Sequence, residues 1–200
     1  MINKTEVPFS ELNINKAEAL RYAGVKGNAD ENTLNLFNKA FELLSQCVKP
    51  KAVYKCLSVS YTANGVIIDN EEIKSLGLKK FLKGADRCAI MAATAGIEAD
   101  RLISRYSMVE PSLALMIDAI SAAAVEALCN KLCKGCFEVD KQRRFSPGYS
   151  DFPIDYQKRI VSLLSTQLNI GVTLTSSLML VPSKSVTAVI PLKGCNSYDN

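Results

Sequence analysis

A long apolar run, Leu113 to Cys129, constrains the fold of this chain more than any other feature. Asp118 and Glu126 interrupt the run, and it falls short of the ~20 apolar residues that a membrane-spanning helix needs. A helix that is apolar on most sides is buried in the core of a protein. The run therefore predicts a core helix, continuing to about Cys136, and the two carboxylates are expected to cap, to pair with an arginine or to reach the surface.

Shorter patterns around this run predict both helices and strands. The continuous apolar segment Cys88 to Ala95 is typical of a central strand, and Asn64-Gly65 predicts a hairpin turn. Asp30 is a good N-cap for a helix that Pro50 ends. The strands and helices do not alternate regularly, which favours an α+β fold with a mostly antiparallel, twisted sheet flanked by helices. No linker divides the chain, so residues 1–200 are interpreted as a single domain.

The last third of the chain carries further local signals. Pro153 is expected in the first turn of a helix that continues to Gln167. Asp151 and Asp155, on either side of this proline, are interpreted as charges that favour the N-terminus of that helix. Two final strand-like runs, Leu178 to Val181 and Ser185 to Leu192, are expected to form a pair joined by a turn at Pro182.

Composition excludes several classes of function. The 200 residues contain no histidine, which rules out Ser-His-Asp and Cys-His hydrolysis and histidine-based zinc sites. A net charge of +4 is too small to suggest nucleic acid as a partner. The seven cysteines, without a signal peptide, favour reduced thiols in the cytoplasm. The chain is therefore expected to hold a reactive molecule rather than to shuttle protons, with no catalytic or metal-binding side chain of its own.

The hexapeptide Arg144-Phe145-Ser146-Pro147-Gly148-Tyr149 offers the groups that such holding requires. Arg144 can bind a carboxylate through two parallel hydrogen bonds. Pro147 and Gly148 together favour a turn that lets backbone approach a ligand closely. Tyr149 adds a flat aromatic face. The segment suits a small ligand with a carboxylate at one end and a flat ring at the other.

Four ordered pieces, the first of them within this hexapeptide, resemble the motifs of a known family. They are Arg144…Gly148-Tyr149, Pro153, Ile170-Gly171-Val172-Thr173-Leu174-Thr175-Ser176-Ser177 and Pro182-Ser183-Lys184-Ser185-Val186-Thr187. In this order they resemble the activation, or reactivation, domain of cobalamin-dependent methionine synthase. The motif-bearing part spans about 110–192, and the first 110 residues look like the stand-alone bacterial relatives of that domain.

The resemblance implies an S-adenosylmethionine site and a role in repair. In the family, oxidised cobalamin is reduced by one electron and remethylated from S-adenosylmethionine. The ligand-binding residues carried over are the hexapeptide, Glu126 from the apolar helix and, as a further candidate, Glu138. Arg144 would pair with the methionyl carboxylate, backbone groups of Ser146 and Gly148 would meet the adenine, and Tyr149 would pack near the adenosyl end or the sulfonium.

The resemblance also implies the partners. Cobalamin would arrive on another protein, either methionine synthase or another corrinoid protein, with a flavodoxin-type electron donor as a further candidate. The chain would be an accessory subunit with little chemistry of its own. Ser176 stands where the family often has Glu, which favours a pocket that a partner completes. The alternative is a docking module for a corrinoid protein that binds no nucleotide.

Three cysteines allow an alternative interpretation, in which the protein is an enzyme of a different class. Cys129, Cys133 and Cys136 have the spacing of the cluster ligands in radical S-adenosylmethionine enzymes. The same spacing places all three on one face of the expected helix, where cysteines pack as small apolar side chains. We keep packing as the interpretation and the [4Fe–4S] cluster as the alternative.

Overall fold

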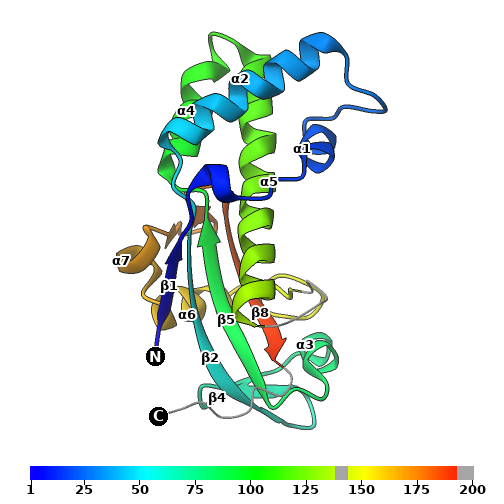
Figure 1. Ribbon diagram of the computed structural model, residues 1–200. Coiled ribbons are helices and arrows are strands. Elements are labelled where there is room, and N and C mark those ends of the chain that lie inside the picture. Colours follow the sequence, from blue (N-terminus) through cyan, green and yellow to red (C-terminus); the bar gives the residue numbers. More distant parts are fainter. Residues whose placement is uncertain (138–143, 193–200) are drawn as a thin grey trace.

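An antiparallel sheet of six strands forms the centre of the computed structural model, which describes residues 1–137 and 144–192 (Figure 1). The strand order is β4-β3-β2-β5-β8, and β1 pairs with β2. The strands are β1 (Asn3–Glu6), β2 (Lys51–Tyr61), β3 (Val66–Ile68), β4 (Glu71–Ile73), β5 (Arg87–Thr94) and β8 (Ser185–Leu192). The expected α+β fold with a mostly antiparallel sheet is confirmed.

Strand β5 lies between β2 and β8 and is covered on both faces. Ala89 and Met91 belong to the core on one face, and Cys88 and Ile90 belong to the core on the other. Because alternate residues of a strand point to opposite faces, only an apolar sequence throughout can fill both cores. The central strand predicted from this run is confirmed.

The first face is covered mainly by α5 (Pro111–Cys136), which runs along the sheet (Figure 1). Helices α1 (Lys16–Tyr22), α2 (Glu31–Cys47) and α4 (Ile97–Ser107) pack against α5 in turn. Asp30 caps α2 as expected, since its carboxylate accepts a hydrogen bond from the Thr33 N–H at 2.8 Å. The Asp118 side chain is 43% exposed and so reaches the surface, one of the outcomes expected for an acid on this helix, and it pairs there with Lys184 at 2.7 Å.

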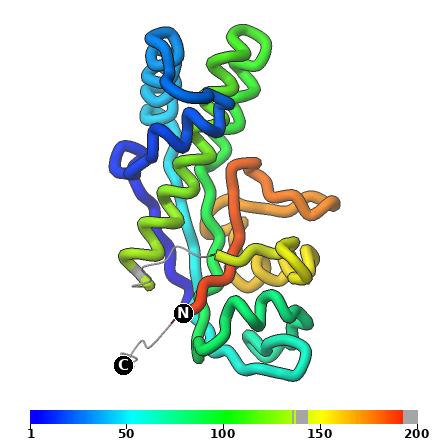
Figure 2. Tube along the Cα trace, turned by 90° about the vertical axis from the view of Figure 1, so that its right-hand side faces the viewer, coloured from blue at the N-terminus to red at the C-terminus, as the bar shows by residue number. Residues whose placement is uncertain are grey.

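The opposite face is covered by three shorter helices, which Figure 2 shows on the other side of the sheet from α5. They are α3 (Leu76–Leu82), α6 (Tyr156–Leu163) and α7 (Thr166–Ile170). Leu78 and Leu82 from α3 and Ile160 from α6 are fully buried there. The domain therefore has three layers, with one long helix on one face and several short helices on the other.

Helix α5 is longer than the apolar run within it. It has 26 residues, and by length and composition Pro111–Gly135 is long enough to cross a membrane, contrary to the expectation from the run alone. However, 72% of its most apolar 18-residue stretch is buried inside the protein. Its apolar surface is thus covered by β2, β5 and the other helices, as in the core helix of a soluble domain.

Three local predictions from the last third of the chain are wrong. Pro153 precedes the first turn of α6 instead of lying in it, and the expected single helix to Gln167 is interrupted at Ser165, which is left-handed with φ 45°. The last two strands do not pair with each other. The first, β7 (Leu180–Val181), pairs with β6 (Thr173–Leu174) in a small separate sheet, whereas β8 joins the main sheet beside β5.

Candidate functional site

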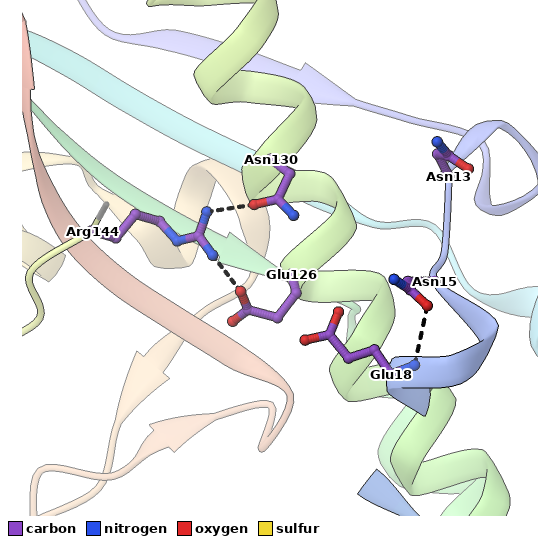
Figure 3. Close-up of a pocket in the computed structure, with 6 residues that line it drawn as sticks. All are labelled: Asn13, Asn15, Glu18, Glu126, Asn130 and Arg144. Carbon is purple, nitrogen blue, oxygen red and sulfur yellow. Dashed lines mark hydrogen bonds and ion pairs between the residues drawn. The ribbon is translucent and has the colours of Figure 1, made fainter. Parts of the chain in front are cut away.

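A polar pocket lies where α1, α5 and the start of the hexapeptide meet. Its volume is about 560 Å³. Two carboxylates, three amides and one guanidinium line it, from Asn13, Asn15, Glu18, Glu126, Asn130 and Arg144 (Figure 3). Such a lining can hold a ligand that carries both a positive and a negative group.

Arg144 lies on one side of this pocket and is held by α5. Its guanidinium donates to Asn130 Oδ1 at 2.8 Å and forms a short ion pair with Glu126 (Figure 3). The Arg144 side chain is only 13% exposed, compared with 38% for Glu126. Burial alone would lower the pKa of Arg144, but the negative charges of Cys129, which ionises only at high pH, and of the Glu126 carboxylate outweigh it and raise the pKa. The pocket therefore contains a fixed cation.

Local sequence explains why these groups face one another. Glu126 and Asn130 are four residues apart on α5, so they lie one turn apart on the same side of the helix. On α1, Asn15 Oδ1 accepts a hydrogen bond from the Glu18 N–H at 3.1 Å, which starts the helix and leaves the Glu18 side chain at the pocket. The Tyr22 hydroxyl donates to the Glu18 carboxylate at 2.7 Å, and this bond, with burial, raises the pKa of Tyr22.

Comparison with known proteins identifies the fold that carries this pocket. No protein-family model and no curated protein matches the chain. Among solved structures, it is similar to one described as the crystal structure of the MetH reactivation domain bound to AdoHcy. The TM-score is 0.77 and the sequence identity 18%, over 100% of this chain and 80% of that chain. This chain has the fold of the MetH reactivation domain. The likeness inferred from the four sequence pieces is thus confirmed for the fold.

Within this MetH reactivation fold, the hexapeptide begins beside β8 at the edge of the sheet, with its first two side chains on opposite faces. Phe145 forms an isolated bridge with Val189 of β8, with N–H···O distances of 3.0 and 2.9 Å. Neighbouring residues of an extended segment point in opposite directions. Arg144 accordingly reaches the pocket beside α5, whereas Phe145 packs with the core on the other face, 5.1 Å from the Phe81 ring.

The remaining hexapeptide residues do not line the pocket. Pro147 is buried, and Gly148 takes a left-handed conformation with φ 89°. The Gly148 N–H donates to the Phe152 carbonyl at 2.8 Å, so this backbone donor already has an acceptor. Tyr149 is 69% exposed and lies 6.0 Å from the Phe145 ring. A contact of Ser146, Gly148 or Tyr149 with the adenosyl group stays a prediction.

The other residues expected at the site are placed as follows. Glu126 lies beside Arg144, although sequence alone did not predict that the two would pair with each other. Glu138 lies outside the described residues. Ser176 lies in the turn between β6 and β7 and does not contribute to the pocket lining.

Sequence reasoning missed Asn13, Asn15, Glu18 and Asn130. The N-capping residue type of Asn15 was a usable signal for the start of α1. Nothing in the local sequence indicated that α1 would pack against α5, because that contact joins segments about 90 residues or more apart.

Cys129 and Cys133 are fully buried in the core beneath Arg144, as the packing interpretation expected. Among the residues that the structure describes, no group of three potential metal ligands occurs, and the side chain of Cys136 lies outside that part. Burial raises the pKa of Cys129 to about 12, so almost no thiolate is present near neutral pH.

We expect Cys129 to resist alkylation in the folded protein. Iodoacetamide at pH 8 should modify the half-buried Cys47 well before Cys129, because both access and thiolate formation are suppressed in the core. Peptide mass spectrometry over a time course would measure both rates, with urea-unfolded protein as the control in which both thiols react. Equal rates in the folded protein would contradict the burial of Cys129.

Proposed function

We propose that this protein is an S-adenosylmethionine-binding reactivation subunit for a cobalamin-dependent methyltransferase, with methionine synthase as the first candidate. The pairing of Arg144 with Glu126 in one polar pocket carries the proposal. The fold supports it, because the similar MetH reactivation domain was solved with AdoHcy bound. The four ordered sequence pieces, which start at Arg144, add independent support.

The Arg144–Glu126 pair suits the amino-acid end of S-adenosylmethionine. The ligand carboxylate would replace Glu126 at the guanidinium, and the released Glu126 carboxylate would accept hydrogen bonds from the ligand ammonium. Every charge keeps a partner during this exchange, which avoids the several kcal/mol that an isolated buried charge costs. The second carboxylate, Glu18, lies across the same pocket and adds a further acceptor.

The proposed methyl transfer requires little chemistry from the side chains of this protein. When bound, S-adenosylmethionine supplies a methyl group to a reduced cobalt centre on the partner, and S-adenosylhomocysteine remains. No proton is transferred in that step, so the absence of histidine is compatible with it. The contribution of the protein is to bind and orient the ligand, which can account for a large part of the rate of a transfer between two bound reactants.

The proposal includes partners that must bring the other components. Cobalamin is carried by methionine synthase or another corrinoid protein, and a flavodoxin-type donor supplies the electron. The reaction takes place in the cytoplasm. The buried state of the most apolar helix supports a protein that works in water.

A reconstitution assay tests this role. A methionine synthase that lacks its own reactivation domain is inactivated by cobalamin oxidation and then given a one-electron reductant and S-adenosylmethionine. Adding this protein should restore methionine formation, and the Arg144→Ala variant should restore much less. Recovery that is equally fast without this protein would contradict the proposed role.

A second function is favoured by one observation. Each terminal nitrogen of the Arg144 guanidinium already donates to a residue of α5, one to Asn130 and the other to Glu126, as in a residue that only holds α5 to the hexapeptide. In that case the protein would be a docking module for a corrinoid protein and would bind no nucleotide. A corrinoid complex that forms with the same affinity with and without S-adenosylmethionine, from a protein that gives no binding heat with S-adenosylmethionine, would support this second function.

A further inference from the structure

The chain just after the hexapeptide is tied to the start of α3 by a single carboxylate. Asp151 accepts hydrogen bonds from the Ser75 hydroxyl at 2.6 Å and from the backbone N–H groups of Leu76 and Gly77 at 2.7 and 3.0 Å. The Ser75 hydroxyl also accepts from the Leu78 N–H at 2.9 Å, so side chains from two distant segments cap the same helix. Asp151 was expected to favour the helix that follows it, and it instead caps a helix 75 residues earlier.

Asp151 lies inside the turn that shapes the hexapeptide. The Tyr149 N–H donates to the Ser146 carbonyl at 3.1 Å, and the Phe152 N–H donates to the Tyr149 carbonyl at 2.9 Å. Between these bonds, Gly148 and Ser150 are both left-handed, with φ 89° and 53°. A non-glycine residue such as Ser150 keeps this conformation only where its surroundings impose it. The three bonds to Asp151, the next residue, supply that constraint.

Helix α3 also holds the other end of the segment. The Phe145 ring packs 5.1 Å from Phe81 of α3 and 6.1 Å from Phe152. Helix α3 thus contacts the segment 145–152 at two points, while β8 holds it from the side through Val189. The backbone position from which Arg144 enters the pocket depends on these three contacts.

We propose that Asp151 is a positioning residue, which fixes the 144–152 segment on α3 so that Arg144 is aligned for the ligand. This inference rests on the proposed binding of S-adenosylmethionine. Asp151 acts through Arg144 and does not meet the ligand, because its carboxylate is already occupied by three donors and it does not line the pocket. The Ser75 hydroxyl, helped by the N–H groups of Gly77 and Leu76, lowers the pKa of Asp151, so the carboxylate stays charged near neutral pH.

A substitution at Gly77 can disturb the contact between Asp151 and α3 from the side of α3. A Cβ atom at Gly77 would lie 2.7 Å from Asp151 Oδ1 and 3.0 Å from the Ser150 hydroxyl oxygen. Alanine favours a helix more than glycine does, so Gly77→Ala strengthens α3 itself while it pushes the segment away. Gly135, in α5, is the matched control, because a Cβ there would meet nothing within 4 Å.

Calorimetric titration with S-adenosylmethionine tests the inference on the full chain. Asp151→Ala and Gly77→Ala should each weaken binding by about tenfold, the effect expected when charge-assisted hydrogen bonds are lost or displaced. Gly135→Ala should bind like the wild type. Asp151→Asn keeps one acceptor oxygen for these donors and should recover part of the affinity. Gly77→Ala distinguishes positioning from a general loss of stability, because this substitution itself favours α3.

The results of these titrations distinguish a failure of the positioning role from a failure of the proposed function. If the wild type binds and the Asp151→Ala and Gly77→Ala variants, folded by circular dichroism, bind equally well, the positioning role is wrong and the proposed function stands. If the wild type itself does not bind S-adenosylmethionine, alone or with a corrinoid partner, the proposed function fails first. Loss of binding in Gly135→Ala to the same extent as in Gly77→Ala would also overturn the inference.

Discussion

Replacing Arg144 by alanine is expected to weaken S-adenosylmethionine binding by about 2 kcal/mol or more, which is roughly thirtyfold in the dissociation constant. The variant removes the cation for the ligand carboxylate. It also leaves Glu126, now without its ion pair, to face the incoming carboxylate across the pocket. Isothermal titration calorimetry of both proteins under the same buffer and salt conditions measures the difference.

Arg101→Ala is the matched control for this experiment. Arg101 is an exposed arginine on α4 that forms an ion pair with Glu98 at 2.5 Å, three residues away. Exposed pairs contribute little, so this variant should change neither affinity nor stability appreciably. A double-mutant cycle with Glu126→Gln would show whether Arg144 and Glu126 act together, since their effects should then not add. An Arg144→Ala variant that binds as tightly as the Arg101→Ala variant would contradict the assignment of the pocket.

Replacing Leu128 by alanine is expected to lower the free energy of unfolding by about 2–5 kcal/mol. Leu128 is fully buried in the middle of the core that α5 shares with the sheet. The smaller side chain loses apolar contacts and leaves a cavity that close-packed neighbours fill only in part. Urea unfolding followed by circular dichroism measures the loss.

Leu115→Ala on the same helix is the control, because Leu115 is 52% exposed. This variant removes the same atoms and makes the same change in helix propensity, and it should cost about 1 kcal/mol or less, since little buried area is lost. Equal destabilisation by the two variants would contradict the placement of α5 as the core helix. The comparison of the two variants therefore tests directly whether the apolar run forms the core helix.

Two elements could be predicted from the sequence because they are buried on both faces or on most sides. Strand β5 had to be apolar from residue 88 to residue 93 because both of its faces are covered there, and α5 had to be apolar on most sides because several elements surround it. In both cases the composition of one segment reflects the surroundings that it meets. The resemblance of the 144–190 region to a known domain then indicated the fold that contains them.

The wrong predictions depend on contacts that a local pattern does not contain. The break at Ser165 requires a left-handed residue where the apolar periodicity continues without interruption. The two last strands join different sheets because β8 has an apolar partner in β5, far away in sequence. Asp151 caps α3 instead of α6 for the same reason, since its donors come from a segment about 75 residues away.

The candidate site was predictable only in part. Arg144 and Glu126 were selected separately, one from a charged turn and the other from an acid on an apolar helix, and the fold brings them into contact. Glu18 and Asn130 carry no local signal of function, because polar residues on helices are usual. Their place in the pocket follows from how α1 and the hexapeptide pack against α5.

The most direct test of the account is a calorimetric titration of the wild-type protein with S-adenosylmethionine, with and without a corrinoid partner. We expect saturable binding of one ligand per chain, lost or strongly weakened in Arg144→Ala and retained in Arg101→Ala. The absence of binding heat in both conditions, from a protein shown to be folded, would contradict it.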